Sequence, residues 1–105
     1  MDFPEGLLYD TYVPIMRLDK YLKVSRILKR RTVANELASN GRVSVNGKTA
    51  KPSADVDVGD EIEVFFGNRR MKVRILKISD SEKKSEAAGM YEVLEESYEE
   101  WKETL

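Results

Sequence analysis

Residues 17–60 read RLDKYLKVSRILKRRTVANELASNGRVSVNGKTAKPSADVDVGD, and the spacing of apolar residues along this stretch changes from helical to extended. In residues 17–26, apolar or small side chains recur at i, i+3, i+4 and i+7. These are Leu18, Tyr21, Leu22 and Ser25. The spacing predicts an amphipathic helix. The opposite side of this helix is cationic and carries Arg17, Lys20 and Lys23.

A second helix is predicted over residues 30–39. Its buried stripe is expected to consist of Val33, Ala34, Leu37 and Ala38. Arg31 and Asn35 lie at the edge of that stripe. Asn40-Gly41 predicts the end of the helix, because glycine enters the left-handed conformation without steric cost. The two short helices form a helix–turn–helix-like pair.

A first hairpin is predicted directly after the second helix. Val43 and Val45 alternate with polar neighbours, which is typical of a strand with one buried face. Asn46-Gly47 favours a type I′ turn, in which both central residues need a positive φ. Residues 48–50 form the returning strand.

A second hairpin is predicted from residues 61–66 and 69–78. Gly67-Asn68 between them indicates a two-residue turn of type II′. Pairing across this turn places apolar residues opposite apolar ones and each acid opposite a base, and such pairs contribute roughly 0.2–1 kcal/mol each. The predicted partners are Val64 with Met71, Ile62 with Val73, Glu63 with Lys72 and Glu61 with Arg74.

Near the end of the chain, large apolar residues recur at +3, +4, +3 and +4, which is the spacing of one helical stripe. They are Tyr91, Leu94, Tyr98, Trp101 and Leu105. The predicted fold class is α+β: two helices packed on a small, mostly antiparallel sheet, plus a C-terminal helix. We expect an irregular leader over residues 1–15, one domain over residues 16–78, and an acidic, helical extension over residues 79–105.

Composition excludes several classes of function. The chain has 105 residues, the length of one domain, and it has no cysteine and no histidine. It therefore lacks a disulfide, a thiolate nucleophile, the usual general base and the commonest metal ligands. We expect no catalysis, no metal and no small-molecule cofactor. No apolar run approaches the ~20 residues that span a bilayer, so we expect a cytoplasmic protein with no membrane partner.

Positive charge is concentrated in residues 16–54, where ten basic residues accompany two acidic ones, although the whole chain has a net charge of −1. Charge runs are usually solvated helix faces, but here nearly all the charge has one sign and lies opposite the apolar stripe. Such a surface attracts polyanions, of which nucleic acid is the commonest. The candidate phosphate contacts are Arg17, Lys20, Lys23, Arg26, Lys29, Arg30, Arg31, Arg42, Lys48 and Lys51.

The order of motifs in residues 17–60 resembles the RNA-binding domain named after small-subunit ribosomal protein S4. That family begins with R-L-D-x-x-L, continues with a basic R-x-x-A helix and G-x-V-x-V-N-G, and ends with a V-x-x-G-D turn. The matching positions are Arg17, Leu18, Asp19, Leu22, Arg31, Ala34, residues 41–47, Val56, Gly59 and Asp60. One departure is Arg30, where the family often has a serine, so the second helix lacks its usual N-cap side chain.

The resemblance implies an RNA-binding protein in which Arg17 and Arg31 contact RNA. Residues 16–31 and 87–96 look most like the small free-standing members of the family that act in bacterial ribosome-associated quality control, and like their small heat-shock relatives. These relatives bind large ribosomal subunits stalled with a peptidyl-tRNA. The implied partners are rRNA, tRNA and quality-control factors, and the implied role is support of tailing of the stalled nascent chain.

Three further residues are secondary candidates for RNA contact. Asn46 is expected mainly as a turn former that tolerates positive φ, with a base or phosphate contact as the alternative. Arg69 and Arg70 lie at the second hairpin turn. They are expected to be freer than the next basic residues along that strand, which the acids across the hairpin should neutralise.

Two other functions stay open. One is general binding of rRNA or mRNA with no role in ribosome rescue. The other is a protein-interaction adaptor that uses the aromatic stripe of residues 91–105, although Tyr91 is expected to pack within the domain. A further hypothesis is that the acidic extension, which carries a net charge of −6 by its nine acids and three bases, competes with RNA for the basic face.

Overall fold

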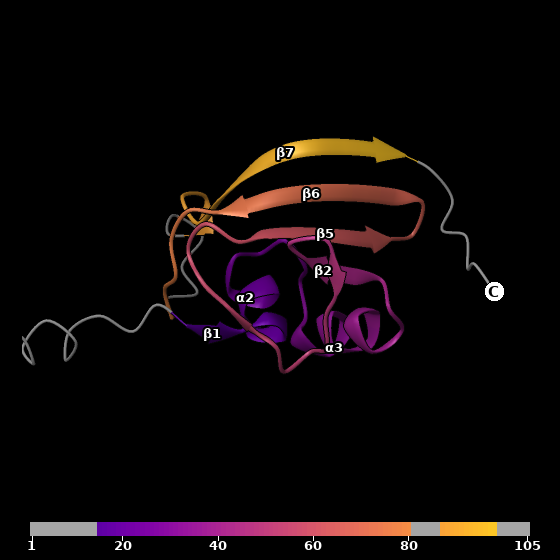
Figure 1. Ribbon diagram of the computed structural model, residues 1–105, viewed down its shortest axis with the longest axis horizontal. Coiled ribbons are helices and arrows are strands. Elements are labelled where there is room, and N and C mark those ends of the chain that lie inside the picture. The colour runs from indigo at the N-terminus through magenta and orange to yellow at the C-terminus, as the bar shows by residue number, and fades with distance from the viewer. Residues whose placement is uncertain (1–14, 81–86, 99–105) are drawn as a thin grey trace, which may run out of the picture.

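The computed structural model describes residues 15–80 and 87–98, which contain two helices and seven strands. The elements in chain order are β1 (Met16–Arg17), α2 (Leu18–Val24), α3 (Arg31–Ser39), β2 (Val43–Val45), β3 (Lys48–Thr49), β4 (Asp55–Val56), β5 (Glu61–Phe66), β6 (Arg69–Ile75) and β7 (Tyr91–Tyr98). An antiparallel sheet has the order β3-β2-β5-β6-β7, and β1 pairs separately with β4. Figure 1 shows both helices near β2 and β5, with β7 at the far edge of the sheet. The α+β fold predicted from the sequence is thereby confirmed.

The first predicted helix is present as α2 but is shorter than expected. Leu18, Tyr21 and Leu22 are fully buried, as the i, i+3, i+4 spacing predicts. The chain leaves the helix through Arg26, whose φ of 64° is the left-handed conformation that often follows a helix end. The N–H of Arg26 donates to the carbonyl of Lys23 at 3.0 Å.

The second predicted helix is present as α3, with Arg30 as an N-cap that makes no side-chain capping hydrogen bond. Ala34 and Ala38 are buried and Leu37 is partly buried. The expectation that Val33 belongs to the buried stripe is wrong, because this side chain is 37% exposed. Because consecutive helix residues lie about 100° apart, Val33 falls at the edge of the face that buries Ala34 and Ala38.

Both predicted hairpin turns are confirmed by their backbone angles. Asn46 and Gly47 have φ values of 51° and 87°, as a type I′ turn requires, whereas in the second turn Gly67 has a φ of 63° and Asn68 is not in the positive region. The register across the second turn also agrees with the sequence prediction. The paired residues are Val64 with Met71, Ile62 with Val73, Glu63 with Lys72 and Glu61 with Arg74.

The C-terminal helix predicted from residue 91 onwards is wrong over residues 91–98, which form β7 against β6. The reason is a β-bulge: Val93 pairs with Val73 and Glu95 with Lys72, so Leu94 is the extra residue between them. This insertion interrupts the two-residue alternation of the strand, so Leu94 is partly buried three residues after Tyr91, whereas Tyr98 of the predicted stripe is 70% exposed. The rest of the predicted helix lies outside the described residues.

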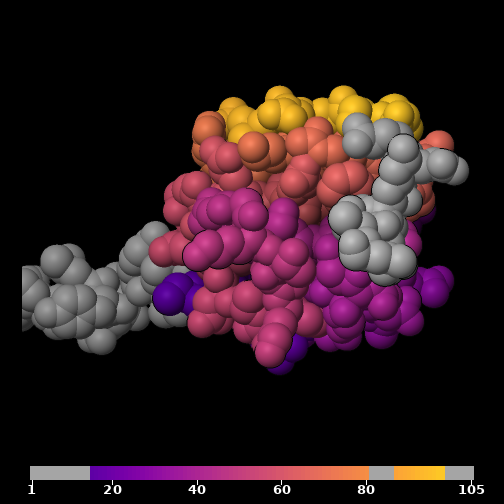
Figure 2. Space-filling model, turned by 45° about the vertical axis from the view of Figure 1, so that its right-hand side comes forward, coloured from indigo at the N-terminus to yellow at the C-terminus, as the bar shows by residue number. Residues whose placement is uncertain are grey.

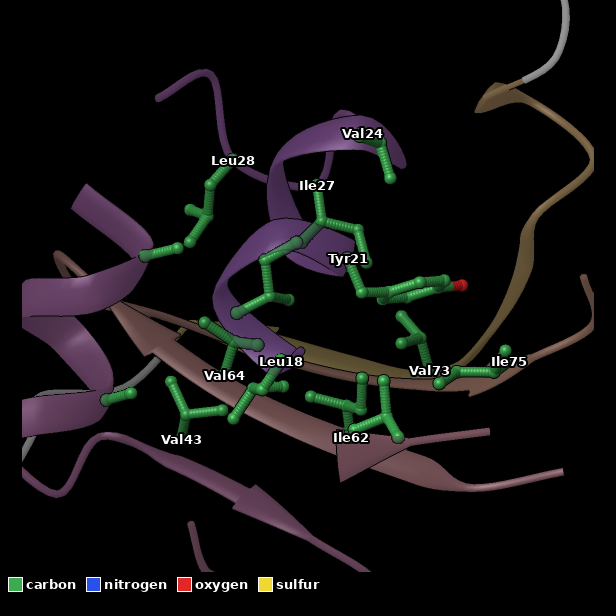
Figure 3. Packing of buried hydrophobic residues seen from close by; sticks show 14 of the residues in the cluster. Leu18, Tyr21, Val24, Ile27, Leu28, Val43, Ile62, Val64, Val73 and Ile75 are labelled. Carbon is green, nitrogen blue, oxygen red and sulfur yellow. The ribbon is translucent and has the colours of Figure 1, made fainter. Parts of the chain in front are cut away.

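The core lies between the helices and one face of β5 and β6. Figure 3 shows Leu18 and Tyr21 from α2 pointing at Ile62, Val64 and Val73 from the sheet. All five side chains are fully buried. The helix pair is therefore held by apolar contact with the sheet, which fixes the position of the cations on its outer side.

Tyr21 also ties α2 to the segment that precedes β7. Its hydroxyl donates a hydrogen bond of 2.8 Å to the carbonyl oxygen of Met90, 69 residues later in the chain. Burial, together with the charge of Tyr91, raises the pKa of Tyr21, so the hydroxyl keeps its proton and remains a donor. Tyr91 is partly buried against the same core, as expected from the sequence.

No helix in the described part of the chain has the length and apolar content that crossing a bilayer requires. The predicted irregular leader lies outside the described residues, except for Ile15.

Candidate nucleic-acid interface

A buried carboxylate on α2 joins the two helices of the cationic segment. Asp19 is 2% exposed, and its oxygens accept hydrogen bonds from Arg17, Arg31 and Asn35. Arg17 is the closest partner, with Nε 3.2 Å from Oδ1 and Nη2 3.1 Å from Oδ2. Nη2 of Arg31 lies 3.3 Å from Oδ1, and Nδ2 of Asn35 lies 3.3 Å from Oδ2. The Asp19 carboxylate therefore holds two guanidinium groups side by side.

The pKa of Asp19 shows that this carboxylate stays ionised. Burial alone would raise the pKa, but hydrogen bonds from Arg17, Asn35 and Arg31 and the positive charge of Arg31 outweigh burial and lower it. One negative charge is thus shared by two positive ones, which leaves a local excess of one positive charge. The side chains of Arg17 and Arg31 are 48% and 46% exposed, so each guanidinium has a face open to a ligand.

The two arginines line a shallow depression at the junction of α2 and α3, whose other lining residues are Asp19, Thr32, Asn35 and Glu36. Arg17 is anchored here by the β1–β4 ladder, in which it pairs with Asp55. The next N–H groups, of Leu18 and Asp19, donate to carbonyls of the loop that leads to β4, at 2.7 and 3.1 Å. The depression can therefore present two fixed guanidinium groups to a phosphate, a planar arrangement that arginine favours.

A second cationic depression lies around the connection between the helices. It is lined by Lys23, Arg26, Leu28 and Lys29. The left-handed backbone of Arg26 turns the chain there, and the N–H of Leu28 donates to the carbonyl of Leu22 at 3.0 Å. Three of the sequence-predicted cations are therefore brought together by the turn rather than by a helical face.

The other predicted cations are distributed around these two depressions. Arg30 is exposed at the start of α3, and Nζ of Lys20 lies 2.5 Å from a carboxylate oxygen of Asp80. Three cations lie on or beside the β2–β3 hairpin rather than in either depression. They are Arg42, Lys48 and Lys51. Figure 2 shows the helical segment and β7 at opposite ends of the visible surface.

The amide of Asn46 is engaged in the fold. Its Nδ2 donates to Asp60 Oδ1 at 3.0 Å, and its Oδ1 accepts from the N–H of Glu61 at 3.0 Å. With a φ of 51°, Asn46 therefore has the geometry of the turn former that the sequence favoured.

The expectation that Arg69 and Arg70 are freer than their neighbours is wrong. Arg69 Nε lies 2.5 Å from Glu96, and Arg70 is paired with both Glu63 and Glu95. The hydrogen bonds that Arg70 donates to Glu95 and to Glu63 raise the pKa of Arg70 against the opposing effect of burial.

The acids across the hairpin behave partly as predicted. Glu61 contacts both Arg74, at 3.0 Å, and Lys72, at 3.5 Å, and the hydrogen bond from Arg74 is the main reason that the pKa of Glu61 is lowered. Glu63 binds Arg70 instead of its direct cross-strand neighbour Lys72.

Sequence reasoning gave Asp19 and Asn35 no role in RNA binding, although both belong to the hydrogen-bonded cluster at the candidate interface. Asp19 had one available signal, because it is the only acid among residues 17–31, which contain seven bases. One carboxylate cannot neutralise seven bases, but it can accept hydrogen bonds from more than one of them and so bring them together. Asn35 had no comparable signal, because its contact depends on how α3 packs against α2.

Comparisons with known proteins find relatives that match most of this chain. Residues 16–62 match the S4 domain family. The RQC P-site tRNA stabilizing factor of Streptococcus pneumoniae is 58% identical over 82 residues, which cover 78% of this chain and 93% of that protein. The protein of the same name from Bacillus subtilis is 54% identical, covering 77% and 94%. Heat shock protein 15 of Escherichia coli is 36% identical, covering 80% and 64%.

Two solved structures share the fold. The structure described as trimeric Vibrio cholerae Heat Shock Protein 15 superposes with a TM-score of 0.70 at 36% identity and covers 75% of this chain and 81% of that one. The solution structure of the hypothetical protein HP1423 superposes with a TM-score of 0.64 at 29% identity and covers 74% and 95%.

Proposed function

The chain belongs to the S4 domain family and, within it, to the family of the RQC P-site tRNA stabilizing factors, and we propose that it binds tRNA and rRNA on stalled large ribosomal subunits. In this role it holds the peptidyl-tRNA in place while the nascent chain is tailed. The protein acts by binding and positioning RNA, and the tailing chemistry belongs to its quality-control partners.

The observation that carries the proposal is the pair of guanidinium groups fixed on the Asp19 carboxylate. Nη2 of Arg17 and Nη2 of Arg31 lie 3.1 and 3.3 Å from that group, and both side chains are about half exposed. Because Asp19 has already restricted the rotamers of the two arginines, a phosphate that binds them costs less side-chain entropy. Charge-assisted hydrogen bonds from arginine to phosphate are also among the stronger polar contacts.

The two cationic depressions suit a protein that recognises RNA by the shape of its backbone. The major groove of an A-form helix is too deep and narrow for side chains, so proteins contact its backbone and its unpaired regions. The depression at Arg17 and Arg31 and the one at Lys23, Arg26 and Lys29 offer separate sets of cations on the same helix pair. This supports simultaneous contact with two backbone segments, for which tRNA and rRNA are our candidates.

The direct test is co-sedimentation with large subunits that carry peptidyl-tRNA, compared with intact ribosomes. We expect the protein to sediment with the stalled subunits and Arg31→Ala to lose most of this binding. Arg74→Ala is the matched control, since it removes an arginine of similar exposure (41%) that is paired with Glu61 and Glu92 on the sheet. Equal binding to intact ribosomes would favour the general RNA grip, and equal loss in both variants would contradict the proposed interface.

The adaptor alternative is separated from RNA binding by nuclease treatment. A partner captured through β7 stays bound when the RNA is digested, whereas a partner held through the ribosome is released. Tyr98, which is 70% exposed, is the aromatic residue to replace in that experiment.

A further inference from the structure

A second row of basic residues lies on the opposite side of the molecule from the helices. Arg70, Lys72 and Arg74 alternate along β6 with the buried residues of that strand, which face α2. Because side chains in a strand alternate between faces, this row lies on the outer face of the sheet. By position alone, it is a further cationic surface that RNA could contact.

Acids from both neighbouring strands occupy this row. On the β5 side, Glu61 contacts Arg74 and Lys72, and Glu63 contacts Arg70. On the β7 side, Glu92 lies 3.0 Å from Arg74 and Glu95 lies 2.9 Å from Arg70. At the end of the strand, Arg69 contacts Glu96 at 2.5 Å.

The charge balance of this face depends on β7. The three basic residues of the outer row are matched by two acids on β5 and by Glu92 and Glu95 on β7, which gives a net charge of −1, and the Arg69–Glu96 pair at the strand end adds none. Without the three acids of β7, the outer row together with Arg69 at the strand end would carry +2. Residues 17–31, on the helical side, contain seven bases and one acid.

We propose that β7 is an acidic cover that keeps RNA off the sheet and confines RNA binding to the helical side. The inference rests on the proposed function, because it concerns where on this protein RNA binds. The specificity-determining residues are Glu92, Glu95 and Glu96. A phosphate that approached the β6 arginines would have to displace carboxylates already bound there, and it would meet their like charge.

A contribution to folding stability explains these ion pairs less well than the exclusion of RNA does. They lie on an exposed face, where such pairs are typically worth ~0–1 kcal/mol. Electrostatic attraction to RNA depends on the number of phosphates neutralised and so responds to every uncovered cation. The same acids therefore have little effect on folding and a large effect on which face of the protein attracts RNA.

The hypothesis that the extension competes with RNA for the helical face stays a prediction, because five of its nine acids lie outside the described residues. Glu92, Glu95 and Glu96 contact β6. Only Asp80, at the start of the extension, contacts the helical cations among the described pairs, through Lys20.

The test uses the full chain with Glu92→Gln, Glu95→Gln and Glu96→Gln combined, and a fluorescent polyuridine as a non-ribosomal probe. We expect polyuridine affinity at low salt to rise at least about fivefold, and the salt slope to steepen by roughly 0.7 for each added contact with single-stranded RNA. Adding Arg70→Gln and Arg74→Gln to this variant should return both values to those of the wild type. A variant with Glu99→Gln, Glu100→Gln and Glu103→Gln makes the same change in net charge and is the matched control.

The proposal is overturned if the β7 variant binds polyuridine no better than wild type, or if the control variant gains as much. A second measurement does not depend on the folding of the β7 variant: Arg70→Gln, Lys72→Gln and Arg74→Gln in the wild-type chain should leave affinity for stalled subunits unchanged, and a loss there would also overturn it. Failure of the proposed function is seen separately, as wild-type protein that does not bind stalled subunits or binds them without needing Arg31.

Discussion

Asp19 and Arg31 lie on consecutive helices, and Oδ1 of the first is 3.3 Å from Nη2 of the second. The same carboxylate is 3.1 Å from Nη2 of Arg17. A negative charge therefore lies at the centre of a surface that we propose to bind a polyanion. Its physical effect is to fix the direction of two flexible cations.

This relationship predicts that Asp19→Asn weakens RNA binding although it makes the protein more positive by one charge. The amide cannot attract both guanidinium groups, so they lose their common anchor and a phosphate must order them. We expect RNA affinity to fall at least about fivefold, measured by anisotropy at fixed salt, because ordering each of the two long side chains costs roughly 0.5–1.5 kcal/mol. Glu36→Gln is the control in the same depression and should leave affinity unchanged or slightly raised. Tighter binding by Asp19→Asn would show that net charge alone governs the interaction.

The lowered pKa of Asp19 makes a prediction about acid stability. An unfolded aspartate has a pKa of about 3.9, and the folded pKa of Asp19 lies below its ordinary value. The folded protein therefore binds this proton less readily than the unfolded chain. The stability contributed by Asp19 is fully present above the unfolded pKa and is lost as the pH falls through the folded pKa.

Thermal melts of wild type and Asp19→Asn should therefore converge as the pH is lowered from about 6 to about 3. Glu61 also has a lowered pKa, through Arg74, but it is present in both proteins and cancels in the difference. A difference in Tm that stays constant over this range would mean that the Asp19 charge does not contribute to folding.

The hydrogen bond between Tyr21 and Met90 gives a prediction about stability without any change in RNA binding. In Tyr21→Phe, the carbonyl of Met90 keeps its hydrogen bond from the N–H of Leu76, at 2.7 Å, so no buried acceptor is orphaned. We expect a loss of about 1 kcal/mol, or a Tm lower by about 4–8 °C in a domain of this size. Tyr98→Phe, at a side chain 70% exposed, should have no measurable effect. A severe loss in Tyr21→Phe would indicate that the core repacks around the missing hydroxyl.

The β5–β6 hairpin was predictable down to its register because its determinants are local. Gly67-Asn68 defines the turn, and the apolar and charged partners match on both faces in one register. β7 was mistaken for a helix because its bulge at Leu94 imitates helical spacing. Its strand conformation depends on pairing with β6, which is a tertiary contact that overrides local pattern.

The candidate site, too, could be predicted from the sequence only in part. Its cationic residues are visible in the sequence, but the convergence of Arg17 and Arg31 on Asp19 requires the packing of α2 against α3. Arg69 and Arg70 were wrongly expected to be free because residues 91–98 were predicted to be helical. As a strand, these residues supply an acid to each arginine.

Arg26 has a left-handed backbone and a charged side chain, so two substitutions there can test the effect of conformation separately from the effect of charge. A non-glycine residue in this conformation costs roughly 1–2 kcal/mol, and glycine avoids that cost but loses roughly 0.5–1 kcal/mol of chain entropy relative to alanine. We therefore expect Arg26→Gly to be more stable than Arg26→Ala by up to about 1 kcal/mol, in denaturant melts with equal m-values. Both variants remove the same charge next to Lys23 and Lys29, so both should bind RNA equally weakly and with the same flattened salt slope. If Arg26→Gly kept the wild-type affinity, the strained turn rather than the guanidinium would be the feature that matters for RNA.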